Sequence, residues 1–186
     1  LRTLGEELAG QHTVLLCTTT KIFPFPDLPC ARTAAELDQL RRSHRLLCAG
    51  TDLPGTGKLA APETPMALLA ERFDYVLVEA DGAARRPLKA HAPHEPVIPT
   101  EANQTICVVG ASGFGRPIAA AAHRPERYAL LAGVPEAAEA AGTAGGRTSI
   151  PHRAETASSS ARARFILIAL ISPFRSVRRP RHAPGS

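Results

Sequence analysis

The residues that decide the fold class are DYVLVEA at positions 74–80. This run is apolar and β-branched without alternation, as expected for a strand that is buried on both faces of a parallel sheet. The same pattern predicts strands at residues 13–19, 46–50 and 105–110, and helices are predicted at residues 1–10, 33–42 and 64–72. Strands that alternate with helices at this spacing predict an α/β fold, in which helices flank a mostly parallel sheet and form three layers with it.

Helix starts are marked by particular residues. Thr33 and Glu36 have the spacing of a capping box, and Pro65 stands where the first residue of the next helix is expected. Residues 123–127, HRPER, give a similar start with Pro125 near the first helical position. These signals predict where the chain turns into helix after each loop.

Two stretches are rich in Gly or Pro and are predicted as loops, at residues 50–63 and 81–104. The first contains Gly-Thr-Gly-Lys at positions 55–58. A phosphate loop needs Ser or Thr after the Lys and a helix behind it, whereas Leu59 follows here. We therefore interpret positions 55–58 as a flexible loop and not as a nucleotide-binding motif.

The net charge divides the chain in two. It is +5 for the whole sequence, but residues 141–186 hold eight Arg and one Glu, so residues 1–140 are slightly acidic. The basic character therefore gives no indication that the body of the protein binds nucleic acid. Residues 136–186 are rich in Ala, Gly, Arg and Pro and are predicted to be a disordered tail. The apolar island at residues 165–171 is either an edge strand or an aggregation-prone segment.

Two further classes of protein are excluded. The longest apolar run is at residues 165–171, far short of the roughly 20 residues of a membrane-spanning helix. The chain has four Cys without a C-x-x-C pair, so we expect reduced core thiols, not disulfides or a zinc site, and a cytoplasmic location. These cysteines are Cys17, Cys30, Cys48 and Cys107.

The predicted strand at 74–80 ends in acidic residues. Glu79 and Asp81 are two residues apart, so both project to one face of an extended segment, and Gly82 comes next. Carboxylates at a strand tip are how nucleotide hydrolases hold Mg²⁺. The alternative is an ordinary strand that ends in solvated acids.

Hydroxyls and a cation lie at the end of the predicted strand at 13–19. Thr18, Thr19, Thr20 and Lys21 can bind phosphate oxygens or complete a magnesium shell, although Thr is also common in strands for its propensity alone. The carboxyl ends of parallel strands meet at one edge of the sheet, so we expect these residues to lie beside those at 79–82.

The loop after Gly82 carries charged and imidazole side chains that can contact a partner or a second ligand. His91 and His94 have the spacing of metal ligands, but no third ligand is evident, so solvated histidines are the simpler interpretation. The predicted partner residues are Arg85, Arg86, Lys89, His94 and Glu95.

Three stretches together resemble one family: VLLCTTTKIFP at 14–24, DYVLVEADGAARRPLKAHAPHEPVIP at 74–99 and HRPERY at 123–128. They are similar to the YqeC-type proteins, an accessory family of selenium-dependent hydroxylases. The resemblance covers residues 1 to about 135. It implies a P-loop NTPase-like domain with Mg²⁺ and ATP or GTP as cofactors. The implied partners are the nucleotide and a molybdenum hydroxylase or its maturation factors.

The resemblance also implies roles for the residues above. Asp81 or Glu79 holds the ion, directly or through water, and the other positions the attacking water. The implied nucleotide contacts are Thr18, Thr19, Thr20, Lys21 and Gly82.

Two departures from the family pattern limit these expectations. The family has a Gly-rich phosphate loop before its first helix, and this chain begins within the helix. We therefore expect residues 1–135 to form an incomplete domain that binds nucleotide weakly or not at all and has no triphosphatase activity. Residues 136–186 depart from the family and have the composition that a reading-frame shift would produce. Two alternatives stay open: a nucleic-acid-binding protein that uses the basic tail, and a non-functional fragment.

Overall fold

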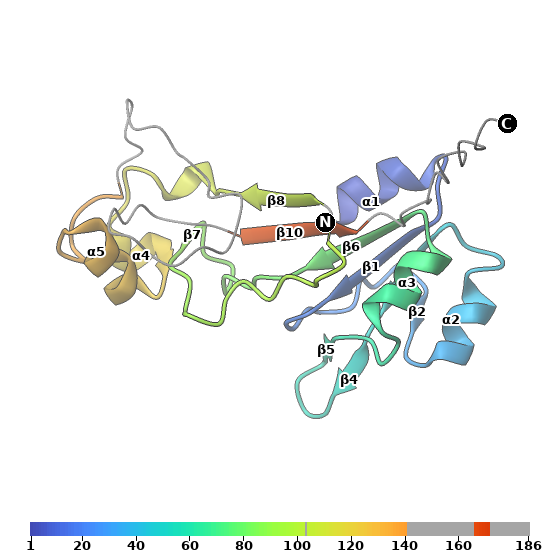
Figure 1. Cartoon of the computed structure of the whole chain (residues 1–186). Helices are drawn as coiled ribbons and strands as arrows, with labels where there is room; N and C mark the ends of the chain where they lie inside the picture. Colours follow the sequence, from blue (N-terminus) through green and yellow to red (C-terminus); the bar gives the residue numbers. More distant parts are fainter. Residues whose placement is uncertain (103, 141–165, 172–186) are drawn as a thin grey trace, which may run out of the picture.

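A six-stranded sheet forms the centre of the protein (Figure 1). The structure, a computed structural model, describes residues 1–102, 104–140 and 166–171. The strands run in the order β2-β3-β1-β6-β10-β8. The first four pair in parallel and are β2 (Cys30–Ala31), β3 (Leu46–Ala49), β1 (Val14–Thr18) and β6 (Tyr75–Glu79). The predicted mostly parallel sheet with flanking helices is confirmed.

The other two strands complete the sheet in an unexpected order. β10 (Ile166–Ile171) lies between β6 and β8 (Gln104–Val108) and is antiparallel to both. The apolar island therefore has neighbours on both sides, and neither an edge position nor an unpaired segment describes it. The disorder predicted for residues 141–165 and 172–186 concerns positions outside the described residues.

Helices cover the two faces of the parallel half (Figure 1). On one face, α1 (Arg2–Ala9) packs its leucines over Leu16 and Leu77. On the other, Leu15 and Val76 pack with side chains of α2 (Ala34–Leu40) and α3 (Met66–Arg72). Successive side chains of a strand point to opposite faces, so the unbroken apolar runs of β1 and β6 fill both layers. No helix within the described residues is long and apolar enough to span a membrane.

The helix starts agree with the predictions in part. Thr33 accepts a hydrogen bond from the Glu36 N–H at 3.2 Å, as in a capping box, but the Glu36 carboxylate accepts from the Arg32 N–H instead of that of Thr33. α3 begins at Met66, so Pro65 is its N-cap and not its first helical residue as predicted. α5 (Pro125–Ala132) begins at Pro125 as predicted.

The predicted loop at residues 50–63 contains a β-hairpin. β4 (Thr51–Leu53) pairs antiparallel with β5 (Lys58–Ala60). Gly55 and Gly57 supply the positive φ angles of 72° and 64° that the turn between them requires. Positions 55–58 therefore reverse the chain, and they do not lead into a helix.

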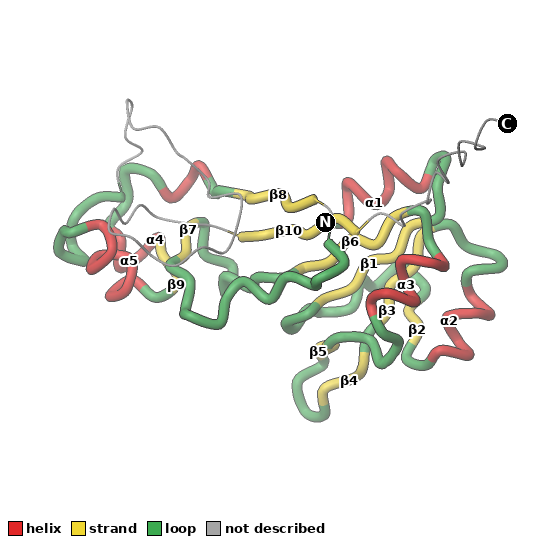
Figure 2. The backbone as a smooth tube through the Cα atoms, in the orientation of Figure 1, coloured by secondary structure: helices red, strands yellow, loops and turns green. Residues whose placement is uncertain are grey.

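A second, smaller cluster of elements lies beyond the end of the sheet (Figure 2). β7 (Leu88–Lys89), which lies in the predicted loop at 81–104, pairs in parallel with β9 (Ala122–His123). α4 (Ile118–Ala121), α5 and the short helix η1 (Ala111–Gly113) surround them. Leu88, Ile118 and Tyr128 are buried here with Ala140, which belongs to the predicted tail. We call this group of elements the second unit.

Candidate functional site

Hydroxyl and carboxylate groups meet where β1 and β6 end. Thr18 and Glu79 are register partners, so the last residues of two neighbouring parallel strands face each other. The Thr18 and Thr20 hydroxyls lie 3.0 Å and 2.7 Å from the same Glu79 oxygen, Oε2, and 3.1 Å from each other. We call Thr18, Thr20 and Glu79 the hydroxyl–carboxylate cluster. The expectation that residues after the two strands share one edge of the sheet is confirmed.

The neighbours of this cluster have different roles. Gly82 borders it, since a Cβ there would lie 3.7 Å from Glu79 Oε1 and 4.0 Å from Thr20 Oγ1. The Thr19 hydroxyl donates to the Val97 carbonyl at 2.6 Å and so fastens the returning loop to β1. Lys21 is exposed.

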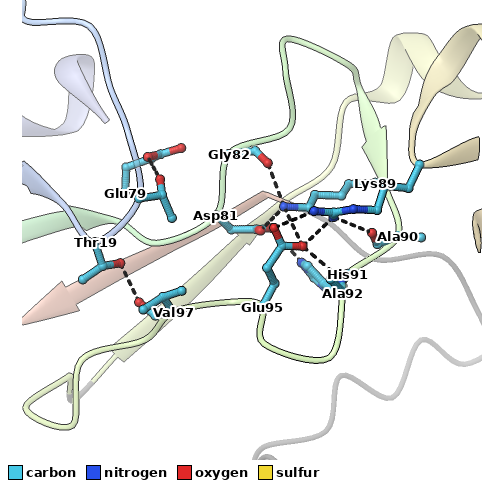
Figure 3. A network of polar contacts seen from close by, with 12 residues as sticks. Thr19, Glu79, Asp81, Gly82, Lys89, Ala90, His91, Ala92, Glu95 and Val97 are labelled. Carbon is cyan, nitrogen blue, oxygen red and sulfur yellow. Dashed lines mark hydrogen bonds and ion pairs between the residues drawn. The ribbon is translucent and has the colours of Figure 1, made fainter. Parts of the chain in front are cut away.

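Asp81 belongs to a separate group of charges, drawn in Figure 3. Asp81 and Lys89 are both fully buried. The Lys89 ammonium donates to Asp81 Oδ1 and, at 2.7 Å, to the Gly82 carbonyl, and it lies 3.2 Å from Glu95 Oε2. His91 Nε2 is 2.6 Å from Asp81 Oδ2. Both carboxylate oxygens of Asp81 therefore have partners within the protein.

Arg124 completes this group from the second unit. It is the N-cap residue of α5, and its guanidinium donates to both carboxylate oxygens of Glu95, at 2.5 Å and 2.9 Å. We call Asp81, Lys89, His91, Glu95 and Arg124 the buried ion cluster. Two carboxylates and two permanent cations balance, which makes the burial of Lys89 and Asp81 tolerable. The cluster ties the end of β6 to the second unit.

The two predicted metal ligands are thus in different surroundings. Glu79 lies among hydroxyls, whereas Asp81, two residues later, pairs with Lys89 and His91 (Figure 3). The extended segment ends with β6 at Glu79, so the spacing of two does not keep both side chains in one group. Within the described residues, no group of three or more His, Cys, Asp or Glu side chains could hold a metal ion.

The predicted partner residues also separate into two sets. Arg85, Arg86 and His94 are exposed, and Arg86 donates to the Ala120 carbonyl. Lys89 and Glu95 belong to the buried ion cluster: Lys89 is fully buried, and the Glu95 carboxylate, which is 15% exposed, pairs with Lys89 and Arg124. Fewer charged side chains of this loop are therefore exposed to a partner than the sequence alone suggests.

Arg124 and Arg127 were not among the predicted site residues. Arg124 binds Glu95, and Arg127 donates to the His91 carbonyl. Both hydrogen bonds join residues that are about 30 positions or more apart in the sequence. No local sequence pattern predicts such a contact. The only signal in the sequence was their place in the stretch at 123–128 that resembles the family.

Glu95 gives the buried ion cluster a dependence on pH. Burial raises the pKa of this carboxyl group, but hydrogen bonds from Arg124, the Ala92 N–H and Lys89 outweigh burial and lower the pKa from 4.5 to about 2. The unfolded chain then binds the proton more readily, so the stability that Glu95 confers is present above its unfolded pKa and is lost as pH falls through the folded pKa. We expect the free energy of unfolding, from urea titrations, to fall between pH 4.5 and about 2.

The variant Glu95→Gln should show a smaller fall over the same pH range, because it has no carboxyl group to protonate. Glu101→Gln is the matched control, since Glu101 is exposed, and it should keep the pH dependence of the unmodified chain. Equal pH dependence in the two variants would contradict this role of Glu95.

Comparison with known proteins agrees with the resemblance. A family model described as YqeC protein matches residues 1–126. A protein of Escherichia coli (strain K12), described as uncharacterized protein YqeC, is 31% identical over 134 residues, which are 68% of this chain and 52% of the relative. The chain therefore spans about half the length of this relative. No solved structure matches. Residues 1–126 contain both the hydroxyl–carboxylate cluster and the whole buried ion cluster, so the matched region includes the candidate site. Because the family model matches more than half of the chain, the chain belongs to the YqeC family.

Proposed function

We propose that the protein binds ATP or GTP with Mg²⁺ at the hydroxyl–carboxylate cluster and serves as an accessory protein in the maturation of selenium-dependent molybdenum hydroxylases. The observation that carries the first part is the meeting of Thr18, Thr20 and Glu79 at the carboxyl ends of β1 and β6. Ligands of open α/β sheets bind at this edge. The second part rests on the YqeC family, and a cytoplasmic location belongs to the same proposal.

The donor set of the cluster fits Mg²⁺. This ion takes oxygen ligands, keeps several waters and is usually held by one or two carboxylates together with the phosphates of the substrate. Glu79 supplies one carboxylate and the Thr20 hydroxyl a further oxygen, while the Thr18 hydroxyl, which is fully buried, orients the Glu79 carboxylate. When bound, Mg²⁺ would neutralise charge on the phosphates. Lys21, which is exposed next to Thr20, would contact them.

Asp81 takes a different role in this proposal from the one first expected. Lys89 and His91 use both of its carboxylate oxygens, and no part of the side chain is exposed. Asp81 therefore fits a positioning residue that anchors the chain just after Glu79, and it does not fit a metal ligand. We therefore propose nucleotide binding without hydrolysis. Hydrolysis would need a second carboxylate to position water, and the carboxylate of Asp81 is already paired with Lys89 and His91.

Paramagnetic NMR tests the proposal and suits weak binding. Mn²⁺ replaces Mg²⁺ as the probe and is added to the full chain with ATP or GTP. We expect the amide signals of residues 18–21 and 79–82 to broaden first, because the ion sits within a few ångströms of them. Glu79→Gln should weaken Mn²⁺ binding by roughly tenfold or more, since even groups outside the ligand shell contribute that much.

Glu63→Gln is the control, because Glu63 is exposed and lies outside the cluster. It should leave the broadening unchanged. Two results would contradict the proposal: no selective broadening at residues 18–21 and 79–82 with either nucleotide, or the same broadening in Glu79→Gln as in the unmodified chain.

A further inference from the structure

Cys30 and Cys48 are neighbours in the structure although they are far apart in sequence. They are register partners on the parallel strands β2 and β3. Adjacent strands are about 4.8 Å apart, which lies within the range of about 4.4–6.8 Å between the Cα atoms of disulfide-bonded cysteines. Their side chains leave the sheet on the same face, so the two sulfurs project side by side from neighbouring strands. The two thiols are therefore close enough to react with each other.

Arg32 gives Cys30 a cationic partner. The Arg32 guanidinium donates from Nη1 to Cys30 Sγ and from Nε to Asp52 Oδ1 at 2.7 Å. The bond to Asp52 holds the guanidinium against the sulfur. Cations and hydrogen-bond donors beside a thiol stabilise its thiolate.

The two sulfurs consequently differ in acidity and access. The hydrogen bond from Cys48 and the charge of Arg32 outweigh burial and lower the pKa of Cys30 to about 7, whereas the bond to Cys30 and burial raise the pKa of Cys48. Cys30 is half-buried on the edge strand β2, and Cys48 is fully buried. A small oxidant from solvent therefore reaches the reactive sulfur first.

Cys17 shows the contrast within the same sheet. It is fully buried among the apolar side chains that face α2 and α3, and burial raises its pKa to about 12. This thiol is a small core hydrophobe, as the sequence predicts for all four cysteines. Cys30 departs from that prediction because of Arg32 and Cys48.

We propose that Cys30 is a peroxide-reactive thiolate and that Cys48 resolves its oxidised form to a disulfide, so that the β2–β3 edge carries a redox modification site. The Cys30 thiolate attacks one oxygen of hydrogen peroxide, the O–O bond breaks, and hydroxide leaves and takes up a proton as water. The Cys48 thiol then attacks the sulfenic sulfur of Cys30. The S–O bond breaks, the Cys48 proton leaves with the hydroxyl as a second water, and the two sulfurs are joined.

The first experiment measures the rate at which iodoacetamide alkylates Cys30 in the full chain as a function of pH. We expect the midpoint of this profile near pH 7. A synthetic peptide of residues 22–32 contains Cys30 and Arg32 without the fold, and its midpoint should lie clearly higher. Because the midpoint does not depend on how accessible the sulfur is, partial burial does not obscure it. A midpoint equal to that of the peptide would overturn the proposal.

Two variants separate the causes. Cys48→Ala and Arg32→Gln each remove one donor to the Cys30 sulfur. A thiol returned to an ordinary pKa near 8.5 should react about three- to fourfold more slowly at pH 7, because the loss of thiolate exceeds the gain in nucleophilicity. We expect each variant to slow alkylation by up to this factor, and Cys17→Ala to leave the rate unchanged.

The second experiment treats the full chain with hydrogen peroxide and maps its tryptic peptides by mass spectrometry. We expect residues 22–32 and 46–58 to appear as one disulfide-linked pair. In Cys48→Ala, Cys30 should instead accumulate as sulfenic acid, trapped by dimedone, and then as sulfinic acid. Absence of the linked pair from the unmodified chain, whether Cys30 stays reduced or is oxidised further, would overturn the proposal.

Discussion

Replacement of Lys89 by Met should lower the free energy of unfolding by about 3–5 kcal/mol, as measured by urea denaturation. Lys89 is fully buried, and its ammonium contacts Asp81, the Gly82 carbonyl and Glu95. Methionine fills a similar volume without charge, so Asp81 would keep its buried carboxylate and lose its permanent cation. An uncompensated buried charge is among the most costly changes a core can undergo.

A second substitution keeps this prediction testable even if Lys89→Met does not fold. The double variant Lys89→Met with Asp81→Leu also removes the carboxylate that would otherwise be buried without a permanent cation. We therefore expect it to recover part of the lost free energy of unfolding. Lys21→Met is the control for loss of an exposed lysine, with an expected change within about 0.5 kcal/mol. A cost of less than about 1 kcal/mol for Lys89→Met, or no recovery in the double variant, would show that Lys89 does not neutralise Asp81 in a buried site.

Replacement of Ala169 by Pro should destabilise the protein by about 3 kcal/mol or more. Ala169 is in the middle of β10, where it pairs with Val78 of β6 and with Thr105 of β8. Proline has no N–H to donate, and it is found essentially only on edge strands or at bulges. A strand with neighbours on both sides cannot accommodate it without losing part of the ladder.

Ala169→Gly is the matched control, because glycine keeps the N–H and changes only the side chain and the backbone freedom. We expect it to cost about 1 kcal/mol or less. Urea denaturation of both variants gives the comparison. If Ala169→Pro were as stable as Ala169→Gly, residues 166–171 would not be part of the sheet.

The parallel half of the sheet could be predicted because its signals are local. The apolar runs of β1 and β6 are continuous, and Thr33 and Pro125 mark helix starts in their immediate surroundings. The hairpin of β4 and β5 was missed because its strands are short and its glycines are equally typical of a loop. The place of β10 was missed because strand order depends on pairing between distant segments, for which a sequence contains no local signal.

The candidate site divides in the same way. That Thr18 and Glu79 share one edge follows from the direction of parallel strands, and the structure brings them together. The partners of Asp81 could not be predicted, because they return to it from eight and ten residues further along a Pro-rich loop. A carboxylate that follows a strand has the same sequence pattern whether it binds a metal ion or forms an ion pair with a lysine.

The place of β10 has a consequence for how the protein is made. Ribosomes add roughly 5–20 residues per second, so several seconds pass between the synthesis of Glu79 and that of Ile166. Throughout that interval β6 has been synthesised, with its apolar residues Val76, Leu77 and Val78, but the strand that pairs with its outer edge has not. An unpaired apolar edge on a nascent chain is a site for incorrect pairing with other chains. Assembly of this sheet is therefore completed only after the ribosome has passed residue 171.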